Sequence, residues 1–150
     1  MPDTTAELKG VGALEIKNEQ QGEVEAVIAT FDVVDKDGDV IHAGAIKNGA
    51  KVKMSSYGHD IIFGEMPVGK GTLVVEGDKA IFRGRVFLST ARGREVFEVL
   101  KEFGSDQEWS FGFRIVSDEE PSDEWRQRGA RRVLKKLEAF EVSPVLEGAG

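Results

Sequence analysis

Three short segments, far apart in the chain, carry between them a hydroxyl, an imidazole and a carboxylate. They are residues 109–114 (WSFGFR) with Ser110, residues 56–60 (SYGHD) with His59, and residues 140–144 (FEVSP) with Glu141. Brought together in space, such groups can act as the nucleophile, general base and orienting acid of a serine hydrolase, whatever their order in the chain. The sequence therefore raises the hypothesis of a hydrolytic triad.

Ser110 lies in a segment that predicts a strand. In an extended chain, one face would carry Trp109, Phe111, Phe113 and Ile115, and the other would carry Ser110, Gly112, Arg114 and Val116. The aromatic face is typical of a core, and the second face would leave open space beside the serine for a peptide. The alternative is an ordinary serine that faces water from a half-buried strand. A serine hydroxyl becomes a nucleophile only when a base lies beside it, so the segment alone does not decide between the two.

The chain has two histidines that could supply the base. His42 follows an acidic turn, and we expect it at the surface or at the end of a strand. His59 lies between Gly58 and Asp60, in a glycine-containing segment whose side chains can project into a cleft. An ordinary histidine titrates near pH ~6.5, which suits a general base at neutral pH. The alternative for His59 is a turn residue that bonds Asp60.

Glu141 lies between Phe140 and Val142, an apolar context in which an unpaired carboxylate is costly. A histidine N–H would supply a partner, and the carboxylate would fix the tautomer of that ring. The alternative is an acid that faces solvent from an amphipathic strand or helix. Ser143 is a second candidate nucleophile, but Pro144 directly after it indicates a turn, so Ser110 ranks higher.

The acidic turn at residues 35–39 (DKDGD) invites comparison with a calcium loop. The spacing of its acids matches the start of an EF-hand, but Gly38 comes too early and Ile46 stands at the last ligand position. The sequence gives equally little support for a zinc site, because it has no cysteine and its two histidines are not close in sequence. We therefore expect neither a metal nor a cofactor.

The composition is that of a single soluble domain, with 150 residues of which 40% are hydrophobic and 31% are charged. The absence of cysteine excludes disulfides and a cysteine nucleophile. No apolar run is long enough to span a bilayer, and the first seven residues lack the order of a signal peptide. The sequence thus predicts an intracellular protein without a membrane partner.

The net charge of −7 disfavours nucleic acid as a direct partner. Basic residues cluster once, at residues 126–136 (RQRGARRVLKK). We interpret them as a solvated segment that offsets the acidic run at residues 118–124, because no aromatic ladder accompanies them.

The pattern of apolar residues predicts a mostly β domain. Strands are expected at residues 14–16, 24–34, 66–76, 80–88 and 109–116. The Gly77-Asp78 pair predicts a tight hairpin turn. Residues 131–143 fit a strand or a helix, residues 118–129 a charged loop, and residues 1–10 a flexible or loosely docked segment.

Residues 91–103 carry the clearest helix signal. One face would hold Val96, Val99, Leu100 and Phe103, and the ends would be capped by Thr90 and Gly104. Residues 43–53 predict a second, short helix, weakened by Gly44 and Gly49.

A series of segments, in order, resembles the prohead proteases of tailed phages, the serine peptidases of capsid maturation. These segments are residues 30–32 (TFD), 37–45 (DGDVIHAGA), 57–60 (YGHD), 67–71 (PVGKG), 90–95 (TARGRE), 109–114 (WSFGFR) and 141–145 (EVSPV). The resemblance covers nearly the whole chain, residues 24–149. Their occurrence together is more specific than any one of them.

The resemblance implies an α+β, mostly β fold similar to the herpesvirus assemblin proteases, a β-barrel flanked by a few helices. It implies His59 as general base, Ser110 as nucleophile and Glu141 as the third member, with no cofactor. The implied activity is that of a serine endopeptidase that removes the scaffolding segment of the major capsid protein and also cleaves itself. It would act in the bacterial host cytoplasm, inside the assembling procapsid, and a homo-oligomer is left open.

The chain departs from the family pattern at Trp109 and Phe111, where smaller aliphatic neighbours of the serine are expected. It ends at Gly150, where relatives often continue, which a trimmed or self-processed C-terminus would explain. Three other functions stay open: an inactive assembly protein with the protease fold, a generic binding module and a small-molecule esterase. The esterase is disfavoured because the chain has no G-x-S-x-G elbow.

Overall fold

The computed structural model describes residues 6–12 and 14–146. The described chain forms one curled, mostly β sheet of nine strands in the order β1-β8-β9-β5-β6-β7-β3-β2, with β4 pairing β9 in addition. The strands are β1 (Ala6–Gly12), β2 (Leu14–Asn18), β3 (Glu23–Thr30), β4 (Asp39–Ile41), β5 (Ala50–Met54), β6 (Gly69–Glu76), β7 (Lys79–Val86), β8 (Glu108–Glu119) and β9 (Arg132–Val145). The predicted mostly β class is therefore correct.

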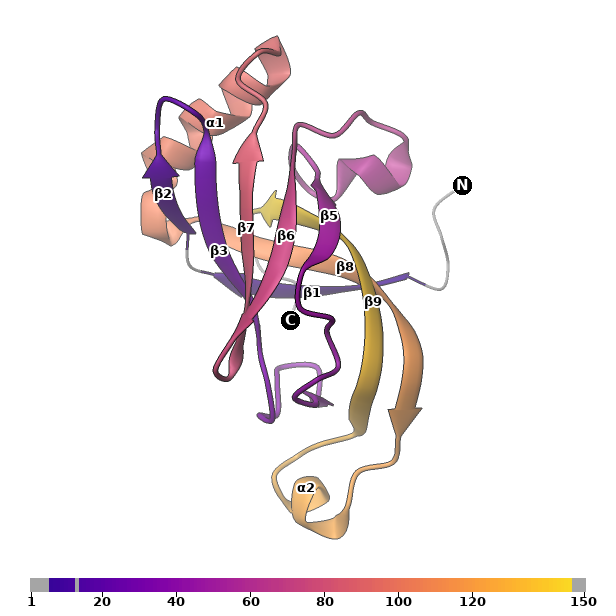
Figure 1. Ribbon diagram of the computed structural model, residues 1–150. Helices are drawn as coiled ribbons and strands as arrows, with labels where there is room; N and C mark the ends of the chain where they lie inside the picture. Colours follow the sequence, from indigo (N-terminus) through magenta and orange to yellow (C-terminus); the bar gives the residue numbers. More distant parts are fainter. Residues whose placement is uncertain (1–5, 13, 147–150) are drawn as a thin grey trace.

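The sheet curls so that β1 and β8 pass behind β3, β7 and β6 and run across them (Figure 1). Helix α1 (Ala91–Phe103) lies at one end, followed by the short 3₁₀ helix η2 (Gly104–Asp106). The hairpin of β8 and β9 extends from the other end and carries α2 (Asp123–Gln127) at its tip. A loop between β5 and β6 contains the 3₁₀ helix η1 (Asp60–Phe63). In the described residues, none of these helices is long and apolar enough to cross a membrane.

The core fills the space inside the curl. On β8, Trp109, Phe111 and Phe113 are fully buried, as the alternation predicted, and the ring of Trp109 lies 5.9 Å from that of Phe82 on β7. Burial of aromatic rings of this size is a main source of stability in a domain of this length. The other side of the sheet carries the polar residues of the strands.

Two local predictions are confirmed in detail. Strands β6 and β7 form the expected hairpin, with Glu76 opposite Lys79 and Gly77 in the left-handed conformation (φ +57°) that the tight turn requires. Helix α1 begins at the Thr90 cap, whose side chain accepts a hydrogen bond from the Gly93 N–H at 2.9 Å, and ends at Gly104.

The prediction for the buried face of α1 is right for Leu100, which is buried, and for Val96, which packs partly buried against the core. It is wrong for Val99 and Phe103, which are 37% and 52% exposed, and Gly93 and Phe97 are buried in their place. The helix passes so close to the preceding chain that a Cβ atom on Gly93 would lie 1.9 Å from the Phe87 carbonyl oxygen. Because only glycine permits this close approach, the helix buries the face that contains Gly93.

The predicted helix at residues 43–53 is wrong. Residues 43–49 form turns and bends, and β5 begins at Ala50. Gly44 and Gly49 have φ values of +91° and +85°, which a right-handed helix does not accommodate.

The ambiguous segment at residues 131–143 is strand β9, and the charged segment before it contains α2. Strand β1 was not predicted; residues 6–10, expected to be loosely docked, belong to a strand that pairs with β8, and residues 1–5 lie outside the described chain. In the β8–β9 hairpin, ion pairs join Arg126 to Glu120, Arg128 to Glu124 and Lys135 to Glu119. These exposed pairs agree with a solvated basic segment that offsets neighbouring acids.

Candidate active site

The structure brings His59 and Glu141 into direct contact, although 82 residues separate them. The Nδ1 atom of His59 lies 2.7 Å from Oε1 and 2.9 Å from Oε2 of Glu141. Both side chains are buried, His59 at 5% and Glu141 at 0% exposure. A carboxylate in this position accepts the Nδ1–H bond and leaves the lone pair of Nε2 free to take a proton.

The loop between β5 and β6 positions the imidazole. Gly58 and His59 both have left-handed backbone conformations, with φ values of +56° and +60°. The His59 N–H donates to Ser143 Oγ at 3.0 Å, and the Gly58 N–H donates to the Pro144 carbonyl oxygen at 3.0 Å. The Ser143 hydroxyl in turn donates to the Pro144 carbonyl oxygen. Ser143, the second candidate nucleophile, therefore holds the loop against β9.

Two residues that the sequence did not single out in these roles support Glu141. The Ser55 hydroxyl donates to Oε2 of Glu141 at 2.6 Å, and its oxygen accepts a bond from the Ile61 N–H at 3.3 Å. Gly112 lies opposite Glu141 in the β8–β9 register, and a Cβ atom there would come within 2.9 Å of Oε1. Gly112 thus leaves room for the carboxylate of Glu141. No local pattern in the sequence indicates that this is why a glycine stands at position 112.

Ser110 lies on the same side of the sheet as this pair. It is directly opposite Ser143, and directly opposed residues of antiparallel strands point to the same face. The prediction of an open face around Ser110 is wrong, because the residue is 0% exposed. Among the described residues, neither Ser110 Oγ nor His59 Nε2 has a hydrogen-bond partner.

The alternative of a turn histidine bonded to Asp60 does not apply. Asp60 instead accepts hydrogen bonds from the Ser56 N–H at 2.9 Å, from the Ser56 hydroxyl and from Arg92 of α1 at 2.8 Å. This network ties the β5–β6 loop to the helix. His42 is exposed at the surface, as expected, with Nδ1 3.5 Å from an Asp32 oxygen. Arg114 lies with its guanidinium 4.5 Å from the centre of the Phe140 ring.

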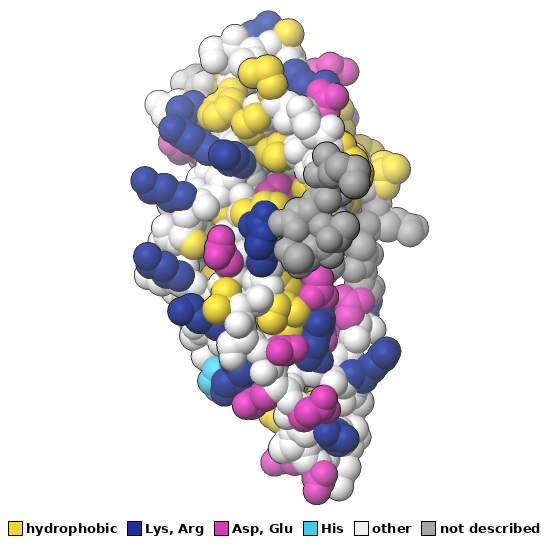
Figure 2. Space-filling model, turned by 90° about the vertical axis from the view of Figure 1, so that its right-hand side faces the viewer, with side chains coloured by type: hydrophobic (Ala, Val, Ile, Leu, Met, Phe, Trp, Pro, Cys, Tyr) yellow, Lys and Arg dark blue, Asp and Glu magenta, His cyan; other side chains and the backbone are white. Residues whose placement is uncertain are grey.

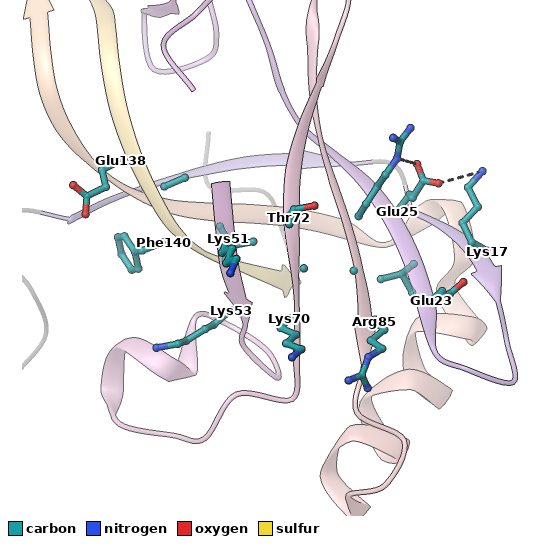
Figure 3. A pocket seen from close by; sticks show the side chains of 16 residues that line it. Lys17, Glu23, Glu25, Lys51, Lys53, Lys70, Thr72, Arg85, Glu138 and Phe140 are labelled. Atoms are coloured by element: carbon teal, nitrogen blue, oxygen red, sulfur yellow. Dashed lines mark hydrogen bonds and ion pairs between the residues drawn. The ribbon is translucent and has the colours of Figure 1, made fainter. Parts of the chain in front are cut away.

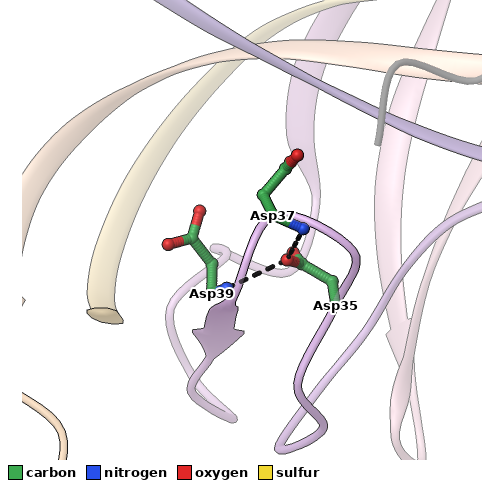
Figure 4. A group of neighbouring side chains, drawn as sticks. All are labelled: Asp35, Asp37 and Asp39. Atoms are coloured by element: carbon green, nitrogen blue, oxygen red, sulfur yellow. Dashed lines mark hydrogen bonds between the residues drawn. The ribbon is translucent and has the colours of Figure 1, made fainter. Parts of the chain in front are cut away.

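The acidic turn is neutralised by a lysine of β1. Asp35, Asp37 and Asp39 converge (Figure 4), and the Lys9 ammonium lies 2.8–2.9 Å from an oxygen of each. A protein cation therefore stands where a metal would bind. Burial lowers the pKa of Lys9, but hydrogen bonds to the three carboxylates outweigh it and raise that pKa above the ordinary value. Burial likewise raises the pKa of Asp39, but hydrogen bonds from Arg132 and Lys9 hold it below the ordinary value.

The solved structure of the bacteriophage T4 capsid assembly protease, gp21, has a similar fold. Its TM-score is 0.61 at 10% sequence identity, and the alignment covers 95% of this chain and 98% of that chain. At this identity the likeness establishes that the two chains share a fold. No curated protein sequence matches the chain.

The family model for the caudovirus prohead serine proteases matches residues 11–149. The chain therefore belongs to the caudovirus prohead serine protease family. The resemblance seen in the sequence is confirmed, and with it the assignment to phage capsid assembly.

Proposed function

We propose that this protein is a serine endopeptidase in which Ser110 is the nucleophile, His59 the general base and Glu141 the acid that orients it. The observation that supports this most directly is the buried contact of 2.7 Å between His59 Nδ1 and Glu141, on the face of the sheet to which Ser110 points. A histidine that is paired with a carboxylate is the group that activates the weak oxygen nucleophile of a serine hydrolase.

In the proposed mechanism, His59 Nε2 takes the proton from Ser110 Oγ as that oxygen attacks the carbonyl carbon of a peptide bond. Glu141 stabilises the resulting imidazolium through Nδ1–H. The imidazolium then gives its proton to the leaving amine nitrogen, the C–N bond breaks, and water releases the acyl group by the same steps in reverse. Catalytic hydrogen bonds often close only when substrate is bound, which fits an unbonded Ser110 and His59 here.

The proposed substrate is the scaffolding segment of the major capsid protein, and the proposed secondary reaction is self-cleavage inside the procapsid. Membership of the prohead protease family supports both. The curled sheet is also consistent with the proposed likeness to herpesvirus assemblin proteases.

The test compares Ser110→Ala with Ser117→Ala, a matched change at an exposed serine of the same strand. Cleavage of a precursor joining scaffold to capsid protein should be lost in the first variant and retained in the second, with both variants folded by circular dichroism. Unchanged cleavage by Ser110→Ala would refute the assignment.

One observation favours a second candidate, an assembly protein that keeps the protease fold without activity. Ser110 is fully buried and is not hydrogen-bonded to His59. Labelling with a serine-directed fluorophosphonate, in the assembled precursor particle as well as in the isolated protein, separates the two. Labelling that requires Ser110 and His59 supports the peptidase. No labelling, either of the isolated protein or of the assembled precursor particle, supports the inactive protein.

A further inference from the structure

A groove with a volume of about 1020 Å³ crosses the outer face of the sheet. Strands β5, β6 and β7 form its middle, β9 borders one side, and β2 and β3 border the other (Figure 3). The strongest feature of its lining is a set of cations on neighbouring strands. They are Lys51, Lys53, Lys70 and Arg85.

The register of the sheet places these cations in a row that begins beside Glu141. Lys53 is the neighbour of Glu141 on β9 and of Lys70 on β6, and Arg85 on β7 continues the row next to Lys70. Val52 and Met54 face the core, so Lys53 faces outward, and Val142 in the core requires the same of Glu141. The groove thus starts one strand away, about 5 Å, from the candidate active site.

Three lysines of this set have no carboxylate partner in the part of the chain that the structure describes, whereas Arg85 has Glu23 opposite it on β3. Within residues 6–12 and 14–146, no carboxylate pairs with Lys51, Lys53 or Lys70. Lys17 and Arg83, at the far side of the groove, are by contrast both paired with Glu25. Figure 3 shows the Lys17–Glu25 pair, and shows Lys53, Lys70 and Arg85 following one another across the strands.

Such a row is unfavourable in the free protein. Like charges directly opposite one another on adjacent strands destabilise a sheet, and Lys70 has Lys53 opposite it on one side and Arg85 on the other. Arg85 also has Glu23 opposite it on β3, so the repulsion is strongest at the two lysines. In a chain with a net charge of −7, a group of neighbouring lysines without carboxylate partners is not a consequence of composition. In Figure 2, Lys and Arg side chains likewise protrude along the left margin, which corresponds to the front of Figure 1. A bound anion would relieve the repulsion.

The geometry favours a polypeptide over a nucleic acid as that anion. Single-stranded nucleic acids need exposed aromatic rings on which bases stack, and the one aromatic residue of the lining, Phe140, has the Arg114 guanidinium over its ring. Extended peptides with acidic side chains need only cations at intervals along an open groove. We propose that this groove is an exosite that binds an acidic, extended polypeptide segment.

Because the groove lies beside Glu141, we identify its occupant as a segment of the polypeptide that is to be cleaved. The groove would hold this segment close to the site of cleavage. This part of the proposal rests on the proposed function. The groove would then select substrates by charge at a distance from the scissile bond, and binding there would raise the local concentration of that bond at Ser110.

The test measures binding directly, by fluorescence anisotropy of a labelled peptide of about eight residues that alternates Glu with Thr. Such a peptide spans about 26 Å when extended, comparable to the distance of about 24 Å across the strands from β9 to β2 that border the groove. The Lys53→Gln/Lys70→Gln variant should bind about tenfold more weakly than the parent protein. The Lys53→Arg/Lys70→Arg variant should retain binding, because the charge is kept. The matched control, Lys47→Gln/Lys136→Gln, removes two exposed lysines outside the groove and should bind as the parent does.

In the binding assay, any of four results would overturn the exosite: no binding of the acidic peptide by the parent protein, equal binding of the same peptide with Gln in place of Glu, equal binding by the Lys53→Gln/Lys70→Gln variant, or tighter binding of a single-stranded oligonucleotide. Precursor cleavage, measured separately, distinguishes the two proposals. Cleavage that needs Ser110 but not the cations refutes the exosite alone. Peptide binding by a protein without cleavage refutes the peptidase alone.

Discussion

The Glu141→Gln substitution tests the electrostatic role of the buried carboxylate. Glutamine has nearly the shape of glutamate, so packing at this fully buried position is kept. The carboxylate accepts two hydrogen bonds, from His59 Nδ1 at 2.7 Å and from the Ser55 hydroxyl at 2.6 Å. An amide has only one acceptor atom, so its NH₂ group must face one of these two partners.

If the NH₂ group faces His59, the imidazole must hold its proton on Nε2, which is the wrong tautomer for a base. If it faces Ser55, the hydroxyl must turn, and the imidazolium formed during the reaction still lacks a counter-charge. Loss of the equivalent acid charge in a serine protease lowers kcat about 10⁴-fold, which corresponds to about 5 kcal/mol of transition-state stabilisation. We expect a loss of about 10³–10⁴-fold in the cleavage rate with little change in KM.

The assay is single-turnover cleavage of the scaffold–capsid precursor, followed by mass spectrometry, together with the rate of fluorophosphonate labelling. Glu102→Gln, at an exposed position of α1, is the matched control and should cleave as the parent protein does. Thermal unfolding verifies that Glu141→Gln remains folded. A cleavage rate within tenfold of the parent would show that the carboxylate does not act on the base.

The remaining predictions concern packing, charge and the groove. Gly112→Ala should cost about 1–3 kcal/mol of unfolding free energy and slow cleavage, because the new methyl group would displace the carboxylate from its place; chemical denaturation and the cleavage assay measure the two effects, and an unchanged rate would contradict the assigned contact. Lys9→Met should destabilise the protein by about 1–3 kcal/mol at neutral pH, because Asp35 and Asp37 lose the ammonium that pairs with them, while Asp39 keeps Arg132; denaturation at neutral pH checks this, and an unchanged midpoint contradicts it. Because the pKa of Asp39 is lowered in the folded protein, its ionised form stabilises the fold. This stability is complete above the ordinary aspartate pKa of about 3.9 and is lost as the pH falls toward the lower pKa of the folded state. The urea midpoint of unfolding should therefore drop in that pH range, and it should drop less in Asp39→Asn. Lys53→Gln/Lys70→Gln should melt at or slightly above the temperature of the parent protein, since it removes opposed like charges; a lower melting temperature in calorimetry would show a structural role.

Local structure was predictable where neighbouring residues determine it. The aromatic alternation of β8, the Gly77 turn and the Thr90 cap depend on contacts within a few residues, and each prediction was correct. The buried face of α1 was not predictable, because it depends on the Phe87 carbonyl against which Gly93 packs. The helix predicted at residues 43–53 failed because two glycines that merely weaken a helix pattern adopt left-handed turns here.

Some features of the candidate site were also predictable from local sequence, and others were not. Residue types and flanking motifs were enough to propose Ser110, His59 and Glu141, and alternation correctly placed Ser110 away from the aromatic core. Its complete burial was not foreseen, because alternation along one strand does not show what covers either face of the sheet. Ser55 was missed as a partner of Glu141, because a serine that contacts a residue 86 positions away leaves no local signal.

The sequence by itself determined the family, the mostly β class and the kinds of chemical group available, since these follow from residue identity and short-range pattern. Only the tertiary structure decided which groups meet. The His59–Glu141 contact, the Lys9 ammonium among the aspartates and the row of cations beside Glu141 all depend on how distant strands pair. Strand register is set by packing over the whole sheet, so it cannot be deduced from any one segment.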